Sequence, residues 1–202
     1  MANMKCLRFK ITVLVALAVF LFVSAQAEIV YKQVNVIVDG HHYWFDLNGD
    51  GIYDFDLGSW LNSGVCWTNP GTESSWSAYV NMTTGNGVVT TSGEFGPYAV
   101  ALPQGAPIDS HQSFGGDGLL TLLEWGDCGT GSFGEWLNLP NRYLGFQLLD
   151  ARRNVHYAWA QVGTFAYIDQ QGGLRSTVFL SGFAWETIPG QGILAGQTSG
   201  EY

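Results

Sequence analysis

The sequence predicts an all-β protein, built as an antiparallel two-sheet sandwich of jelly-roll-like form with long loops. Three observations indicate this fold. The 202-residue chain contains 27 glycines, it is rich in aromatic and β-branched residues, and it shows no helical periodicity. Apolar residues instead alternate with polar ones over short segments, as they do in strands with one buried face.

The chain begins with a sequence typical of a secretory signal peptide. A basic region (Lys5, Arg8 and Lys10) precedes an apolar run, which is followed by an A-x-A cleavage motif ending at Ala27. The apolar run is too short for a comfortable membrane span. We therefore expect a signal peptide over residues 1–27, and a secreted, extracellular bacterial protein with a single β-sandwich domain over 28–202 and no membrane span in its mature form.

The first half of the mature chain predicts short strands. Val34, Val36 and Val38 alternate with Gln33, Asn35 and Ile37 and precede a turn at Asp39-Gly40. A hairpin follows over 43–45 and 52–57. Residues 58–76 are predicted to form a long polar connection. Shorter strands are expected at 78–80, 88–91 and 98–102.

The second half is better patterned. An apolar strand is predicted over 119–125, followed by a loop-rich stretch over 127–141. Leu144, Phe146 and Leu148 then alternate with less apolar residues, so we expect these three side chains to point inward. A turn at 150–154, a returning strand at 155–162 and a hairpin over 165–168 and 174–185 complete the sandwich.

Residues 46–56 predict a cation site. Their oxygen-bearing side chains and the glycine at position 51 match the first nine positions of an EF-hand loop, but the twelfth position is Leu57 rather than glutamate. The aromatic and β-branched flanks favour strands, so we expect a strand-loop-strand hairpin that binds Ca²⁺. The alternative is a hydrated turn, since Asn-Gly and Asp-Gly are strong turn dipeptides. The predicted ligands are Asp46, Asn48, Asp50, Ile52, Asp54 and Asp56.

Charge and cysteine content agree with export. Removal of the signal peptide takes away three of the eight basic residues and none of the seventeen acidic ones, so the net charge falls from −9 to −12. This acidity disfavours nucleic acid and anionic membranes as partners. Cys66 and Cys128 are the two cysteines left after cleavage, and a disulfide is the expected state in an exported chain. The alternative, a reactive or metal-binding thiol pair, lacks a suitably spaced histidine.

Tryptophans in the predicted loops suggest a binding role. Flat aromatic rings can stack on sugars, and the candidates are Trp67, Trp76, Trp125 and Trp136. The alternative is that these rings close the ends of the core. Catalysis is less well supported, because no catalytic motif is present and His156 lies in a patterned strand as a packed residue. The pairs Glu124 with Asp127 and Glu73 with Glu135 remain as candidate carboxylates of a hydrolase.

A family resemblance rests on the last third of the chain. YLGF at 143–146, HYAWA at 156–160, GFAWET at 182–187, PG at 189–190 and ILAG at 193–196 resemble uncharacterised exported bacterial proteins that often carry a PEP-CTERM sorting tail. YAVALPQGAPI at 98–108 and Trp136 are also similar. The resemblance implies export and a β-rich fold but no activity, and the PEP-CTERM tail is not found here.

The sequence thus predicts a secreted, non-catalytic structural or adhesive protein with a calcium-binding loop. Extracellular polysaccharide or cell-surface components are the expected partners. A carbohydrate-binding module that uses loop tryptophans is the alternative, and a glycan-active hydrolase is a weaker one.

Overall fold

The computed structural model describes residues 28–65, 72–83, 85–127, 129–168, 170 and 174–200. These residues form an all-β protein without helices, so the all-β part of the predicted fold class is confirmed. No helix that could cross a membrane occurs in this part of the chain. The predicted signal peptide, both cysteines and Trp67 lie outside the described residues.

Fourteen strands follow one another along the described chain. In sequence order they are β1 (Ile29–Val38), β2 (His42–Phe45), β3 (Phe55–Val65), β4 (Thr72–Met82), β5 (Gly87–Gly93), β6 (Gly96–Ala99), β7 (Pro107–Ile108), β8 (Phe114–Gly115), β9 (Asp117–Gly126), β10 (Gly131–Phe133), β11 (Arg142–Leu149), β12 (Val155–Ile168), β13 (Leu174–Glu186) and β14 (Ile193–Leu194).

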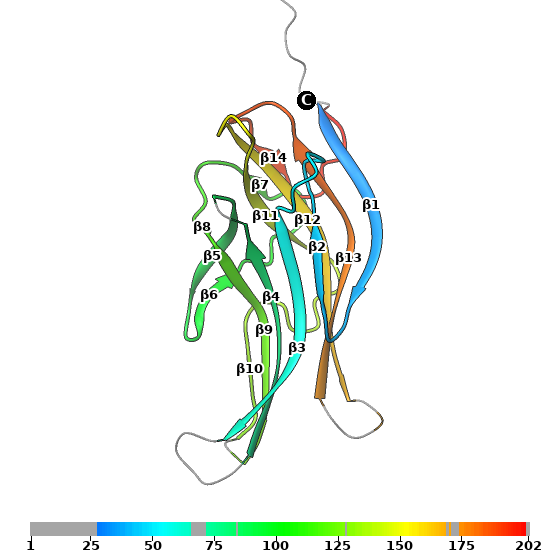
Figure 1. Cartoon of the computed structure of the whole chain (residues 1–202), viewed down its shortest axis with the longest axis vertical. Coiled ribbons are helices and arrows are strands. Elements are labelled where there is room, and N and C mark those ends of the chain that lie inside the picture. Colours follow the sequence, from blue (N-terminus) through cyan, green and yellow to red (C-terminus); the bar gives the residue numbers. More distant parts are fainter. Residues whose placement is uncertain are drawn as a thin grey trace, which may run out of the picture.

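Twelve of these strands belong to one mixed sheet that curves almost into a barrel (Figure 1). Its order is β1-β13-β12-β11-β5-β6-β9-β4-β3-β2, with β8 paired to β5 and β10 paired to β9, while β7 and β14 form a small separate sheet. The pairing thus differs from the two separate antiparallel sheets that the sequence predicted. The reason lies in β5: its first residues pair with β11 and β8, and its last four pair with β6. Strand β6 then pairs in parallel with β9.

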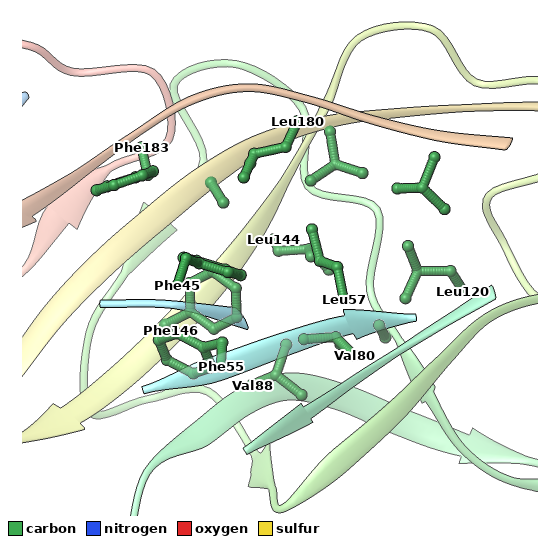
Figure 2. Close-up of a cluster of buried hydrophobic side chains, with 14 of the residues drawn as sticks. Phe45, Phe55, Leu57, Val80, Val88, Leu120, Leu144, Phe146, Leu180 and Phe183 are labelled. Carbon is green, nitrogen blue, oxygen red and sulfur yellow. The ribbon is translucent and has the colours of Figure 1, made fainter. Parts of the chain in front are cut away.

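The main core lies between the two halves of this sheet (Figure 2). The predicted inward residues of β11, Leu144, Phe146 and Leu148, are at most 1% exposed. They meet residues of β2 and β3, and the rings of Phe146 and Phe55 are 4.0 Å apart at their centroids. Each half of the sheet therefore buries the apolar face of the other, and the predicted alternation in β11 is confirmed.

The opposite face of β11 is also buried, which the sequence analysis did not predict. Tyr143 is 7% exposed and belongs to a second apolar cluster together with Ile108 and Ile193 of the small sheet. A Cβ atom added at Gly145 would lie only 2.8 Å from the Leu102 side chain. The glycine in this strand therefore allows the chain around Leu102 to pack closely onto the outer side of β11.

The prediction of a long polar connection over residues 58–76 is wrong. Most of it is the long β3–β4 pair, whose register runs from Phe55 opposite Met82 to Val65 opposite Thr72. The many Ser, Asn and Gly residues of this segment indicated a loop, but β4 also pairs with β9 over residues 73–81. Because neighbouring strands on both sides satisfy the backbone hydrogen bonds of β4, tertiary pairing overrides the weak local strand propensity.

The core position of Phe146 predicts a large effect on stability. Phe146→Ala is expected to lower the free energy of unfolding by about 3–5 kcal/mol, because it removes a fully buried ring and leaves a cavity against Phe55. The half-buried neighbour Gln147 provides the control, and Gln147→Ala is expected to cost under about 1 kcal/mol. Urea denaturation of the two variants measures both values, and equal small losses would contradict this description of the core.

Candidate functional site: an aromatic face beside an acidic loop

Strand register places a group of aromatic side chains on the outer side of β2, β3 and β4. Trp44 pairs with Asp56, and Gly58 lies between His42 and Tyr79 on the two neighbouring strands. Side chains that are directly opposite each other in neighbouring strands share one face of the sheet. Phe45 and Phe55 point into the core, so their alternating neighbours must point outward. We call the outer group of His42, Trp44, Tyr53, Trp60 and Tyr79 the aromatic face.

The rings of the aromatic face contact one another and remain open to solvent. Trp60 lies against His42 and Tyr79, with centroid distances of 4.8 and 5.2 Å. Trp44 stacks on His42 with ring centroids 6.4 Å apart, and the ring of Tyr53, in the loop between β2 and β3, lies at the same centroid distance from Trp44. Trp44 is 49% exposed and Trp60 is 38% exposed. A contiguous patch of large, half-exposed rings is unusual for a monomer surface and is typical of a binding site.

Gly58 is required for this arrangement. A Cβ atom at position 58 would lie 2.3 Å from the ring of Tyr79, so any other residue would displace that ring. The Tyr79 ring therefore covers the glycine between β2 and β4. This cross-strand contact holds the ring flat against the sheet.

A buried carboxylate lies beneath the aromatic face. Asp56 is 1% exposed, and its Oδ2 accepts a hydrogen bond of 2.7 Å from His42 Nδ1 and one of 3.4 Å from Asn81 Nδ2. The Tyr79 hydroxyl lies 3.4 Å from His42 Nδ1 and 3.3 Å from His42 Nε2, so it contacts the edge of the imidazole between the two nitrogens. The result is a chain from Tyr79 through His42 to Asp56, which fixes three of the outward-facing side chains relative to one another.

The surroundings of Tyr79 favour its neutral form. Burial, with a smaller contribution from the negative charge of Asp56, raises the pKa of Tyr79 to about 12. The neutral phenol therefore packs against His42 and helps to fix the rings of the aromatic face.

The acidic loop, residues 46–54, joins β2 to β3 beside the aromatic face. The two carboxylate oxygens of Asp46 accept hydrogen bonds from the amides of Gly49 and Gly51, at 2.6 and 2.8 Å. Asp50 accepts from Ile52 N at 2.8 Å. Both glycines have positive φ, 79° and 88°, a conformation that bulkier residues adopt poorly. The backbone amides of the loop thus neutralise part of its negative charge.

Asp54 and Asp56, two of the remaining predicted ligands, have other hydrogen-bond partners. Asp54 is 4% exposed and accepts from Leu47 N and Asn86 Nδ2, each at 2.9 Å, so it anchors the loop to the segment before β5. Burial raises the pKa of Asp54, while its hydrogen bonds oppose that rise. Asp56 belongs to the aromatic face instead. Within the described chain, no three acidic, histidine or cysteine side chains are close enough to form a metal-binding group. A calcium site therefore depends on Asp46, Asn48 and Asp50 together with backbone oxygens.

The tryptophans proposed for sugar stacking are mostly buried. Trp76 and Trp136 are 1% and 0% exposed, and their indole N–H groups donate to Ser59 Oγ and to the carbonyl of Ala99, both at 2.7 Å. These two fill the core, as the alternative interpretation expected, and Trp125 is half-buried on β9. The exposed ring of Trp44 was not among the predicted residues, and Trp60 lies on β3 rather than in the connection predicted over 58–76. The signal was present, because an inward Phe45 requires an outward Trp44 in the same strand.

The residues considered for catalysis are held by hydrogen bonds or by strand pairing. His156 is 5% exposed, and its Nδ1 lies 2.9 Å from the carbonyl oxygen of Glu186, so the prediction of a packed, hydrogen-bonded histidine is confirmed. Among the carboxylates considered for a hydrolase, Glu135 accepts from Ala101 N at 3.1 Å. Glu124 lies on β9 opposite Gly131 of β10.

The raised pKa of Tyr79 predicts a pH dependence of stability. The folded protein holds this proton more tightly than the unfolded chain, so the resulting stabilisation is complete below about pH 10 and is lost as the pH rises towards about 12. Over that interval, the free energy of unfolding of the wild type should fall more steeply than that of Tyr79→Phe. Denaturant titrations at both ends of the interval test this, and parallel slopes for the two proteins would contradict it.

Comparison with known proteins found no relative of this chain. No family model, no curated protein and no solved structure matches it. The resemblance to exported proteins with PEP-CTERM tails therefore stays a prediction from the sequence. A functional proposal has to rest on the aromatic face and the acidic loop themselves.

Proposed function

We propose that this protein is a secreted, non-catalytic adhesive module that binds neutral polysaccharide through its aromatic face. The observation that carries the proposal is the contact group of Trp44, Trp60 and their neighbouring rings, half-exposed on the outside of a sheet. The proposal combines the adhesive role and the sugar-binding role that the sequence suggested. It assigns the binding to strand tryptophans in place of the loop tryptophans.

The shape of the face supports an extended ligand. Neighbouring strands are about 4.8 Å apart, so rings on β2, β3 and β4 form a row roughly as wide as two sugar units. An aromatic ring stacks on the apolar C–H face of a sugar while its own polar edge stays in water. The rings are already packed against one another, and this reduces the side-chain entropy that binding would otherwise cost.

Charge supports a neutral ligand. The chain carries a net charge of −9, and a carboxylate lies directly beneath the rings. Polyanionic glycans and nucleic acids would be repelled by this field. Neutral polysaccharide avoids that repulsion, and its hydroxyl groups can donate hydrogen bonds to exposed acceptors.

Export and calcium belong to the same proposal. We infer that residues 1–27 are removed, that the domain works outside the cell, that Cys66 and Cys128 form a disulfide there, and that Ca²⁺ binds the acidic loop. A sandwich-like module held by a disulfide and an ion suits an extracellular setting.

Binding to insoluble polysaccharides tests the proposal. Cellulose, chitin, xylan and starch granules are suitable neutral probes, and the protein should be retained by at least one of them. Trp44→Ala and Trp60→Ala should each weaken retention about fivefold, since losing one stacked ring costs on the order of 1 kcal/mol. Phe165→Ala is the matched control, because Phe165 is 41% exposed but belongs to β12. Unchanged retention in both tryptophan variants would rule the aromatic face out.

Thermal unfolding tests the calcium site. Calcium at a hundredfold excess over its dissociation constant should stabilise the fold by about 2.7 kcal/mol relative to chelator. Asp50→Ala should abolish this difference, whereas Asp117→Ala, an exposed carboxylate outside the loop, should preserve it. Identical melting midpoints of the wild type in calcium and in chelator would show that the loop is a plain turn.

A further inference from the structure

A cleft of about 560 Å³ lies beside the β5–β6 hairpin, at one side of the molecule (Figure 1). It is lined by residues 90–93 of β5, by Gly96 and Pro97 of β6, and by Ser113, which precedes β8. The amide of Thr90 donates a hydrogen bond to the carbonyl oxygen of Ser113 at 3.0 Å, and this contact joins the two walls. We call this feature the hairpin cleft, and none of its lining residues belongs to the aromatic face.

Strand register explains why three hydroxyl groups line the hairpin cleft. Ser92 of β5 lies opposite Pro97 of β6, so the two side chains share one face of the hairpin. Thr90 is two residues away from Ser92 in the same strand, so its side chain points to that face as well. Ser113 lies along the neighbouring edge of β5. Three hydroxyls and one proline ring therefore line the same cleft.

These hydroxyl groups are available to a ligand. Within the part of the chain that the structure describes, the side chains of Thr90, Ser92 and Ser113 make no hydrogen bond to another residue. A hydroxyl can both donate and accept. The three groups therefore keep this capacity for water or for a bound molecule.

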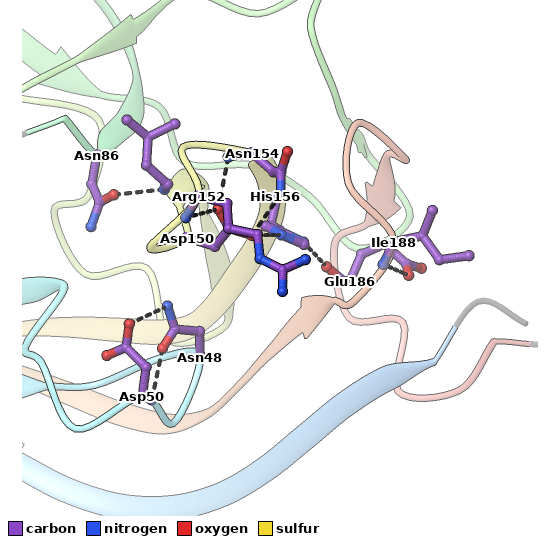
Figure 3. Close-up of polar contacts among 10 residues, drawn as sticks. Asn48, Asp50, Asn86, Asp150, Arg152, Asn154, His156, Glu186 and Ile188 are labelled. Carbon is purple, nitrogen blue, oxygen red and sulfur yellow. Dashed lines mark hydrogen bonds and ion pairs between the residues drawn. The ribbon is translucent and has the colours of Figure 1, made fainter. Parts of the chain in front are cut away.

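The cleft between the acidic loop and the β11–β12 turn is different, because its polar groups already have partners in the protein (Figure 3). Asp150 Oδ2 accepts a hydrogen bond of 2.8 Å from the Asn154 side chain. His156 Nδ1 lies 2.9 Å from the carbonyl oxygen of Glu186, and its Nε2 lies 3.6 Å from Asp150 Oδ2. Of these two clefts, the hairpin cleft is therefore the one whose polar side chains are left for a ligand.

The lining of the hairpin cleft favours an uncharged ligand with several hydroxyl groups. No charged side chain is among its described lining residues. A charged ligand would lose hydration there without meeting an opposite charge. A sugar can exchange hydrogen bonds with all three hydroxyls, while the ring of Pro97 offers an apolar wall to its C–H groups. The volume of the cleft lies within the usual range for ligand pockets.

An extended peptide fits the hairpin cleft less well. Peptides add to a sheet through a row of free backbone groups along a strand edge. On this edge of β5, Val88 and Val89 pair with β8, and the amide of Thr90 binds Ser113. The strand ends at Gly93, so little edge remains for another strand. Side-chain hydroxyls are thus the main polar groups that the cleft offers.

We propose that the hairpin cleft binds one uncharged sugar unit, whose hydroxyl groups exchange hydrogen bonds with Thr90, Ser92 and Ser113 while its C–H face rests on Pro97. This site goes beyond the polysaccharide binding proposed for the aromatic face and does not rest on it. With both sites occupied, the protein would hold a long chain along its sheet and a single unit at its hairpin. Two linked sites of this kind raise avidity for a glycan that reaches both.

Nuclear magnetic resonance of the isotope-labelled protein tests the proposal. Glucose, galactose, mannose, xylose and N-acetylglucosamine are the probes. At least one of them should shift the backbone amide resonances of Ser92 and Gly96 in a saturable way. Ser92→Ala and Ser113→Ala should each weaken that binding about fivefold, the effect expected when one hydrogen bond between uncharged groups is lost. Ser132→Ala is the matched control, because Ser132 is an exposed serine on β10 outside the cleft.

Two further variants complete the test. Thr90→Val keeps the shape of the side chain and removes its hydroxyl, so it should weaken binding to a similar extent without changing the thermal melt. The Trp44→Ala, Trp60→Ala double variant should keep the full response of Ser92 and Gly96, whether or not the aromatic face binds polysaccharide. Absence of a saturable shift with all five probes would overturn the proposal. Unchanged affinity in all three hydroxyl variants, or loss of the response in the double tryptophan variant, would overturn it as well.

Discussion

The register of the β2–β3 hairpin is the constraint on which the rest of the surface depends. Phe45 pairs with Phe55, and both rings enter the core where Phe55 meets Phe146 of the opposite half of the sheet. Because side chains alternate along a strand, these two inward rings direct Trp44 and Asp56 outward. A slip of one residue would turn Trp44 and Asp56 towards the core and Phe45 and Phe55 away from it. The packing that stabilises the fold therefore also sets the composition of the aromatic face.

The acidic loop borders two features of the surface. Tyr53 at its end contacts Trp44 of the aromatic face, and Asp50 lines a cleft together with Asp150 and His156. Asp54 anchors the loop by accepting hydrogen bonds from Leu47 N and from the Asn86 side chain. An ion bound by the loop would stiffen the segment whose Tyr53 contacts Trp44.

Much of the fold could be predicted wherever one face of a strand is apolar. The alternation of Leu144, Phe146 and Leu148 was read correctly because it reflects burial against a single partner layer. The same reasoning failed on the other face of β11, where Leu102 and the small sheet cover Gly145. It also failed over residues 58–76, since a Ser- and Asn-rich strand shows no alternation and forms only because its neighbours complete its hydrogen bonds.

The sequence by itself determined the all-β class, the hairpin around the acidic loop, and the inward residues of β11. These features depend on local pattern and turn chemistry, which are present in any short stretch of chain. Only the tertiary structure decided that Trp76 and Trp136 are buried while Trp44 and Trp60 are exposed, and that Asp50 and His156 line one cleft. Exposure and proximity depend on which distant segments pack together, and no local pattern encodes that.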